Sequence, residues 1–95
     1  MFDSLPTENI ENVSLFLKER RVVMNLTQKE ASERSGVNLE TLRHFEQTGQ
    51  ISLLNFFKLL SIYRMDRRIM ECIKDRSWWT LEQLEKSEKR KRARS

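Results

Sequence analysis

The chain has one cysteine, one proline, two glycines and one histidine among its 95 residues. The single cysteine, Cys72, cannot form a disulfide within the chain, and no cluster of cysteine and histidine is present to hold a metal. Few glycines and prolines, and no run that alternates β-branched with polar residues, exclude a strand-rich architecture. We therefore expect an all-α fold with no metal and no cofactor.

Long hydrophobic runs are also missing. No apolar segment approaches the roughly 20 residues that a membrane-spanning helix needs, and the N-terminus lacks the basic and apolar regions of a signal peptide. These absences predict a soluble, cytoplasmic protein with no membrane partner. The apolar share of 38% is modest, so we expect one helical core with part of its surface covered by a partner chain.

Patterns that indicate catalysis do not occur. The sequence has no serine, histidine and aspartate set, no phosphate-binding loop and no pair of catalytic carboxylates. His44 is the only histidine and has neither a nucleophile nor a ligand cluster to serve. The chain is therefore predicted not to be an enzyme.

The segment 26–38 is the most informative part of what is present. Thr27 and Glu30 have the spacing of a capping box that opens a helix. Gly36 permits a tight turn, and Asn38 can cap a second short helix. Two short helices joined in this way form a helix-turn-helix, whose second helix fits the major groove of DNA.

Apolar spacing and capping residues predict the rest of the architecture. A compact five-helix domain is expected, with helices over 11–24, 28–35, 39–47, 53–63 and 66–74, and Ser52 is expected to cap the fourth. A capping box at Thr80 and Gln83 opens a short extra helix that dissolves into a basic tail. The domain boundaries are a flexible arm at 1–9, the helix-turn-helix domain at 10–75 and the C-terminal part at 76–95. The residues expected to be buried are Val13, Leu17, Arg21, Met24, Val37, Leu42, Phe45, Leu53, Phe56, Phe57, Leu59, Leu60, Tyr63, Ile69, Met70, Cys72 and Ile73, with Trp78 and Trp79 in the core or in a dimer interface.

The net charge of +4 is concentrated at the C-terminus, where residues 86–95 contain six basic residues and one acidic residue. Such a tail can contact DNA phosphates, although many basic tails are only solvated. The candidate phosphate-contacting residues are Lys89, Arg90, Lys91, Arg92 and Arg94.

Residues 13–63 resemble the Cro and phage-repressor class of helix-turn-helix domains, often called the xenobiotic-response-element family. The resemblance depends on the joint order of Arg21, Leu26-Thr27-Gln28, Ser35-Gly36-Val37, Leu42, Glu46 and Ile51-Ser52-Leu53. The segment 45–52 and the helical, basic ending are similar to small antitoxins of the HipB kind. Two departures are Asn25, where the family commonly has glycine, and the Leu39-Glu40 opening of the second helix, which leaves the base preference open.

The resemblance implies roles for particular residues. Arg21 and Glu46 would form an inward-facing ion pair, the alternative being two ordinary surface charges. Thr27 and Gln28 would lie at the DNA backbone, with Gln28 bonded to a phosphate; the alternative is an exposed polar residue. The outward face of the helix over 39–47 would contact phosphates and bases. This face and its cap consist of Asn38, Leu39, Glu40, Thr41, Arg43 and His44.

These expectations combine into a sequence-specific DNA-binding regulator. One short helix reads too few base pairs for useful specificity, so a homodimer on an inverted-repeat operator is expected, with half-sites about 34–36 Å apart on double-stranded DNA. Repression of its own operon is the expected outcome. The alternative is a protein-interaction module, an antitoxin that sequesters a toxin protein of the kinase type and also represses transcription.

Overall fold

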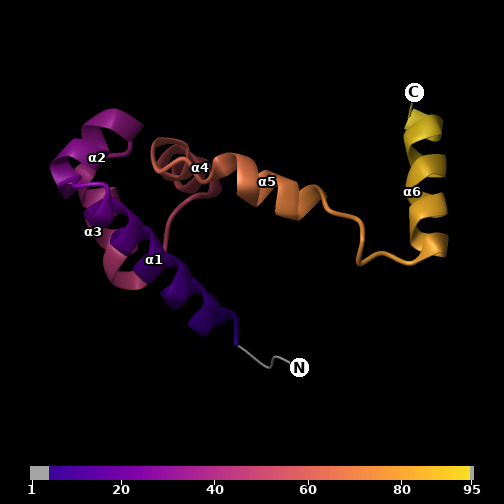
Figure 1. Cartoon of the computed structure of the whole chain (residues 1–95), viewed down its shortest axis with the longest axis horizontal. Coiled ribbons are helices and arrows are strands. Elements are labelled where there is room, and N and C mark those ends of the chain that lie inside the picture. Colours follow the sequence, from indigo (N-terminus) through magenta and orange to yellow (C-terminus); the bar gives the residue numbers. More distant parts are fainter. Residues whose placement is uncertain (1–4, 95) are drawn as a thin grey trace.

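The computed structural model describes residues 5–94 of the chain, with side chains as far as Lys91 (Figure 1). This part contains helices and no strand, so the prediction of an all-α fold is confirmed. The helices are α1 (Pro6–Val23), α2 (Gln28–Ser35), α3 (Leu39–Thr48), α4 (Leu53–Ile62), α5 (Asp66–Lys74) and α6 (Leu81–Arg94).

Helix α1 begins earlier than predicted. Its first residue is Pro6, so residues 6–9, expected in a flexible arm, are helical; residues 1–4 of that arm lie outside the described part. Proline suits the first helical position because it has no backbone N–H there to leave unpaired and its φ is already helical. At the other end, Asn25 adopts a φ of 59°, the left-handed conformation that asparagine tolerates better than most residues with a side chain.

The predicted capping residues are confirmed and set the starts of four helices. The Thr27 hydroxyl accepts a hydrogen bond from the backbone N–H of Glu30, and the Glu30 carboxylate accepts one from the N–H of Thr27. Asn38 caps α3, Ser52 caps α4, and Thr80 with Gln83 forms a second reciprocal box at α6. Each cap satisfies backbone N–H groups that the first turn of a helix leaves without partners.

Helices α1–α4 enclose the core. Helix α1 packs on α3, and α2 packs on both α3 and α4. The ring of Phe45 meets that of Phe56 edge-on, with centroids 6.2 Å apart. The buried apolar residues are Leu17, Leu26, Ala31, Val37, Leu42, Phe45, Leu59, Leu60 and Tyr63.

Several residues expected in the core are exposed. On α1 the buried stripe runs through Ser14, Leu17 and Arg21, so Val13 lies at its exposed edge. Leu53 is 72% exposed because it lies at the solvent side of the first turn of α4. Cys72 and Ile73 are exposed because α5 packs mainly on α4 and extends beyond it.

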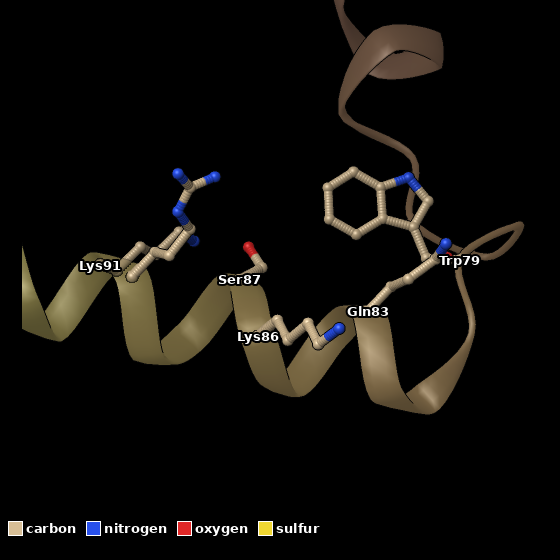
Figure 2. Close-up of a pocket in the computed structure, with 6 residues that line it drawn as sticks. Trp79, Gln83, Lys86, Ser87 and Lys91 are labelled. Carbon is tan, nitrogen blue, oxygen red and sulfur yellow. The ribbon is translucent and has the colours of Figure 1, made fainter.

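The C-terminal part departs most from expectation. Helix α6 stands apart from α1–α4, at the end of the molecule opposite α2 and α3 (Figure 1). Trp78 and Trp79 are 73% and 38% exposed, so neither belongs to the core. The Trp79 indole instead lies over the first turns of α6 (Figure 2). The basic tail is not a frayed end, because α6 continues to Arg94.

Candidate nucleic-acid interface

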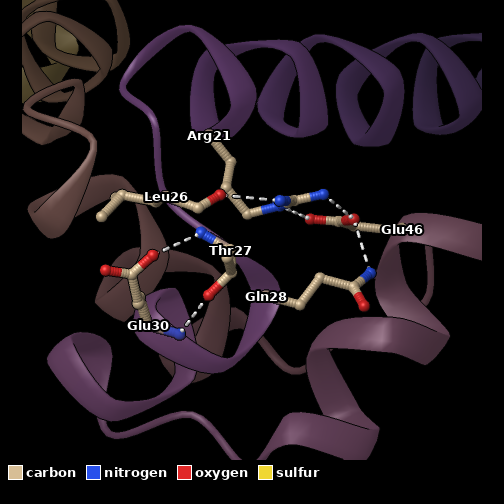
Figure 3. Close-up of polar contacts among 6 residues, drawn as sticks. All are labelled: Arg21, Leu26, Thr27, Gln28, Glu30 and Glu46. Atoms are coloured by element: carbon tan, nitrogen blue, oxygen red, sulfur yellow. Dashed lines mark hydrogen bonds and ion pairs between the residues drawn. The ribbon is translucent and has the colours of Figure 1, made fainter.

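A buried ion pair joins α1 to the end of α3 (Figure 3). The Arg21 guanidinium donates from Nε to Oε2 of Glu46 at 2.8 Å and from Nη2 to Oε1 at 3.0 Å. Its Nη1 donates to the backbone carbonyl oxygen of Leu26 at 2.8 Å. The two side chains are only 9% and 4% exposed, so the predicted inward-facing pair is confirmed and the alternative of two surface charges is wrong.

Gln28 completes this network from the first turn of α2. Its Nε2 donates to Oε1 of Glu46 at 2.9 Å (Figure 3). The carboxylate of Glu46 therefore ties α1, α2 and α3 together, and the Gln28 side chain is half-buried rather than freely exposed. The Gln28 amide has a second N–H, so its contact with a DNA phosphate stays a prediction.

Arg21 and Tyr63 each keep one charge state around neutrality. The hydrogen bonds that Arg21 donates to the Glu46 carboxylate, helped by the negative charge of that carboxylate, raise the pKa of Arg21 against the opposing effect of burial. Burial, together with the nearby Glu46 carboxylate, raises the pKa of Tyr63 to about 12. Since neither group changes charge near pH 7, the positions of α2 and α3 do not depend on the titration of Arg21 or Tyr63 in that range.

The outward face of α3 has the orientation predicted for it. Leu42 and Phe45 are buried against the body, while Glu40, Arg43 and His44 are exposed. Gln47 extends this exposed face by one turn. It was not predicted from the sequence as an interface residue, although its spacing of seven residues from Glu40 places it on the same face of the helix. Of the remaining candidates, Asn38 is exposed, and Leu39 and Thr41 are half-buried.

The polar groups on this face are only loosely engaged. Arg43 Nη1 lies 2.8 Å from Glu40 Oε1, with the side chains 50% and 79% exposed. Exposed ion pairs three residues apart contribute a few tenths of a kcal/mol, so Arg43 can exchange its partner at little cost. The Asn38 Oδ1 atom is occupied by the cap, which leaves its amide nitrogen for an acceptor such as a phosphate.

The charge of the α2–α3 region is not strongly basic. Residues 27–48 contain three basic and four acidic residues, and one of the acidic residues is the paired Glu46. The basic excess lies in α6, where Lys89, Arg90 and Lys91 are exposed; Arg92 and Arg94 belong to α6, but their side chains lie outside the described part. Helix α6, which carries the tail, and α3 lie at opposite ends of the molecule and do not form one site (Figure 1).

Among the residues with described positions, no group of three or more histidine, cysteine, aspartate or glutamate residues is arranged to hold a metal ion. None of the described helices is both long and apolar enough to cross a membrane. The exposed face of α3 carries a carboxylate, a guanidinium, an imidazole and an amide, and it is the candidate nucleic-acid interface.

Comparison of the chain with models of protein families, with curated proteins and with solved structures gives no match.

Proposed function

We propose that this protein is a sequence-specific DNA-binding regulator that represses its own operon as a homodimer and acts in the cytoplasm. In this proposal α3 lies in the major groove of an inverted-repeat operator. The observation that supports it best is the exposed face of α3, which presents Glu40, Arg43, His44 and Gln47. On the buried side of the same helix, Glu46 bonds to Arg21 of α1 and to Gln28 of α2.

The chemistry of this face suits direct reading of base edges. An arginine can donate two hydrogen bonds to guanine, a glutamate accepts from cytosine, and a glutamine can bond to adenine. Reading bases requires that the helix keep its position while its side chains change partners. The buried pair of Arg21 with Glu46 would keep the helix in position. The exposed pair of Arg43 with Glu40 would let these side chains change partners.

The chain also has apolar surface for a second copy. Phe16 on α1 and Leu53 and Leu54 on α4 are each more than half exposed. Exposed apolar residues of this size favour association where they form a continuous surface. A two-fold dimer would place two α3 helices on half-sites about 34–36 Å apart.

Selection of binding sites from random duplex DNA by the full-length protein tests the proposal. We expect one inverted-repeat sequence to be enriched. Arg43→Ala should then weaken binding to the selected duplex by roughly 5- to 150-fold and relax the preference at one position of each half-site. Arg67→Ala is the matched control, because it removes an exposed positive charge from α5 instead of α3.

Two outcomes would contradict the proposal. The first is that no duplex competes better than random DNA. The second is that Arg43→Ala and Arg67→Ala weaken binding equally, which would indicate attraction to net charge without base reading. Analytical ultracentrifugation of the complex should find two chains per operator, and a single chain would contradict the dimer.

A second candidate function is that of an antitoxin, and the exposed apolar residues beyond the core favour it. Ile73, Trp78 and Leu81 lie outside α3, and each is more than half exposed. A toxin partner, expected to be of the kinase type, would cover them. Co-expression with the product of the adjacent gene should then give a stoichiometric complex that Trp78→Ser weakens and Arg43→Ala leaves intact.

A further inference from the structure

A pocket opens between the Trp79 indole and one face of α6 (Figure 2). Its volume is about 380 Å³, within the roughly 300–1,000 Å³ of small-molecule sites. The indole forms one wall and the helix the other, and the lining residues are Trp79, Gln83, Lys86, Ser87, Arg90 and Lys91. It lies in the C-terminal part of the chain, far from the exposed face of α3 (Figure 1).

The local sequence builds this pocket. The carboxylate of Asp75 accepts a hydrogen bond from the N–H of Ser77, and the N–H of Trp79 donates to the carbonyl oxygen of Arg76. These two turns reverse the chain just before the Thr80–Gln83 capping box starts α6. The side chains at 83, 87 and 91 recur every four residues, so they share the face of the helix that the indole overhangs.

The Trp79 ring is available for stacking. Trp79 is 38% exposed, and the guanidinium of Arg76 lies over the ring, 5.1 Å from its centroid, without lining the pocket. The neighbouring Trp78 instead donates its indole N–H to the carbonyl oxygen of Asp75 and does not line the pocket. An aromatic ring beside cations is the arrangement with which proteins stack unpaired bases, at about 1–3 kcal/mol per base.

The cations of the pocket are free to change partners. Lys86 Nζ lies 3.4 Å from Glu82 and Lys91 Nζ lies 3.9 Å from Glu88, and all four side chains are exposed. Such pairs contribute little to stability. Arg90 has no ion-pair partner among the residues with described side chains. A phosphate would gain shorter, charge-assisted hydrogen bonds from these groups.

We propose that this pocket binds a nucleotide whose base is unpaired. The base stacks on Trp79, the phosphate lies among Lys86, Arg90 and Lys91, and Gln83 and Ser87 supply polar contacts. The ligand is either a free mononucleotide or one nucleotide of a single strand, since both offer the same base and phosphate. The site does not depend on the reading of duplex DNA by α3.

An anionic membrane is the competing partner for a basic helix with a tryptophan. A helix that lies on a membrane needs a broad apolar face opposite its cations. Among the described side chains of α6, only Leu81 and Leu84 are apolar and large, and the pocket itself is lined by an amide, a hydroxyl and cations. The composition therefore favours a nucleotide.

Tryptophan fluorescence tests the proposal, because Trp78 and Trp79 are the only two tryptophans. In the Trp78→Phe variant all tryptophan fluorescence comes from Trp79, and in the Trp79→Phe variant it all comes from Trp78. Titration at low salt with thymidine monophosphate or a thymidine octanucleotide should quench the first variant and not the second. Arg90→Gln in the Trp78→Phe background should weaken binding about fivefold or more, whereas Lys74→Gln on α5 should not.

The titrant that quenches the fluorescence distinguishes a free mononucleotide from a nucleotide of a single strand. Quenching by the mononucleotide supports a free nucleotide, and quenching by the octanucleotide alone supports a single strand. Equal quenching of both variants, no quenching of either, or a response only to anionic phospholipid vesicles would overturn the proposal. None of these failures would bear on selection of a duplex by α3, because the side chains proposed to read the base pairs lie on α3 and Trp79 is not among them.

Discussion

The guanidinium of Arg21 lies in a bidentate ion pair with Glu46, 25 residues further along the chain, and both side chains are almost wholly buried. The network gains Gln28 as a third side chain, and Arg21 also donates to the carbonyl oxygen of Leu26. A charge on an otherwise apolar helix face is tolerated because the guanidinium is paired and hydrogen-bonded where it is buried. The position of α3, and with it the candidate interface, depends on this ion pair.

Removal of one partner of this pair should destabilise the protein strongly. Arg21→Met is expected to lower the free energy of unfolding by about 3–5 kcal/mol, because it leaves Glu46 buried without a counter-charge. Urea denaturation followed by circular dichroism measures the loss. Combining Arg21→Met with Glu46→Leu should recover part of it. Arg43→Met, which breaks the exposed pair with Glu40, is the control, and an equal loss there would contradict the argument.

The two glycines should respond differently to alanine. Both have a left-handed φ, 79° at Gly36 and 82° at Gly49, so each alanine has a backbone cost of about 1–2 kcal/mol. A Cβ at Gly36 meets nothing within 4 Å, whereas one at Gly49 would clash with the side chain and crowd the backbone of Ile10. Thermal unfolding should therefore show the larger loss for Gly49→Ala, and Ile10→Ala should relieve part of it. Equal losses would refute this account.

The capping box of α2 should make stability depend on pH below neutrality. The hydrogen bond from the backbone of Thr27 lowers the pKa of Glu30 below its ordinary value of 4.5. The ionised Glu30 carboxylate contributes fully to the free energy of unfolding above pH 4.5. This contribution is lost as the pH falls through the lower pKa that Glu30 has in the folded state. Glu30→Gln keeps a neutral acceptor, so the difference in melting temperature between the native chain and this variant should shrink on acidification. Glu33→Gln on the same helix is the control, and a similar trend there would count against the cap.

The basic face of α6 should set the salt dependence of DNA binding. If Lys89, Arg90 and Lys91 neutralise phosphates, replacing all three with glutamine should flatten the plot of log affinity against log salt by about 0.9 for each phosphate that is no longer neutralised. The matched control is the triple variant Arg67→Gln, Arg68→Gln and Lys74→Gln, which removes three positive charges from α5 instead of α6. Fluorescence anisotropy with the selected duplex gives both slopes. Equal slopes for the two variants would show that only net charge matters.

Local signals accounted for most of the helical architecture. Thr27, Asn38, Ser52 and Thr80 mark helix starts because each side chain bonds to backbone groups within three residues, a relation that spacing reveals. The predicted start of α1 was wrong, because Pro6 is the first helical residue and not part of an irregular arm. The exposure of Leu53, Cys72 and Trp78 was missed because apolar character does not show what covers a side chain.

The order of the residues was therefore enough to establish most of the helices, the caps at Thr27, Asn38, Ser52 and Thr80, and the inward face of α3. These features follow from interactions a few residues apart. The pairing of Arg21 with Glu46 was expected from family resemblance, but its geometry and the capture of Gln28 required the folded chain. The separation of α6 from α3, and the pocket beside Trp79, likewise follow from packing in three dimensions. No local rule specifies such packing, because it depends on which surfaces find a partner when the chain folds.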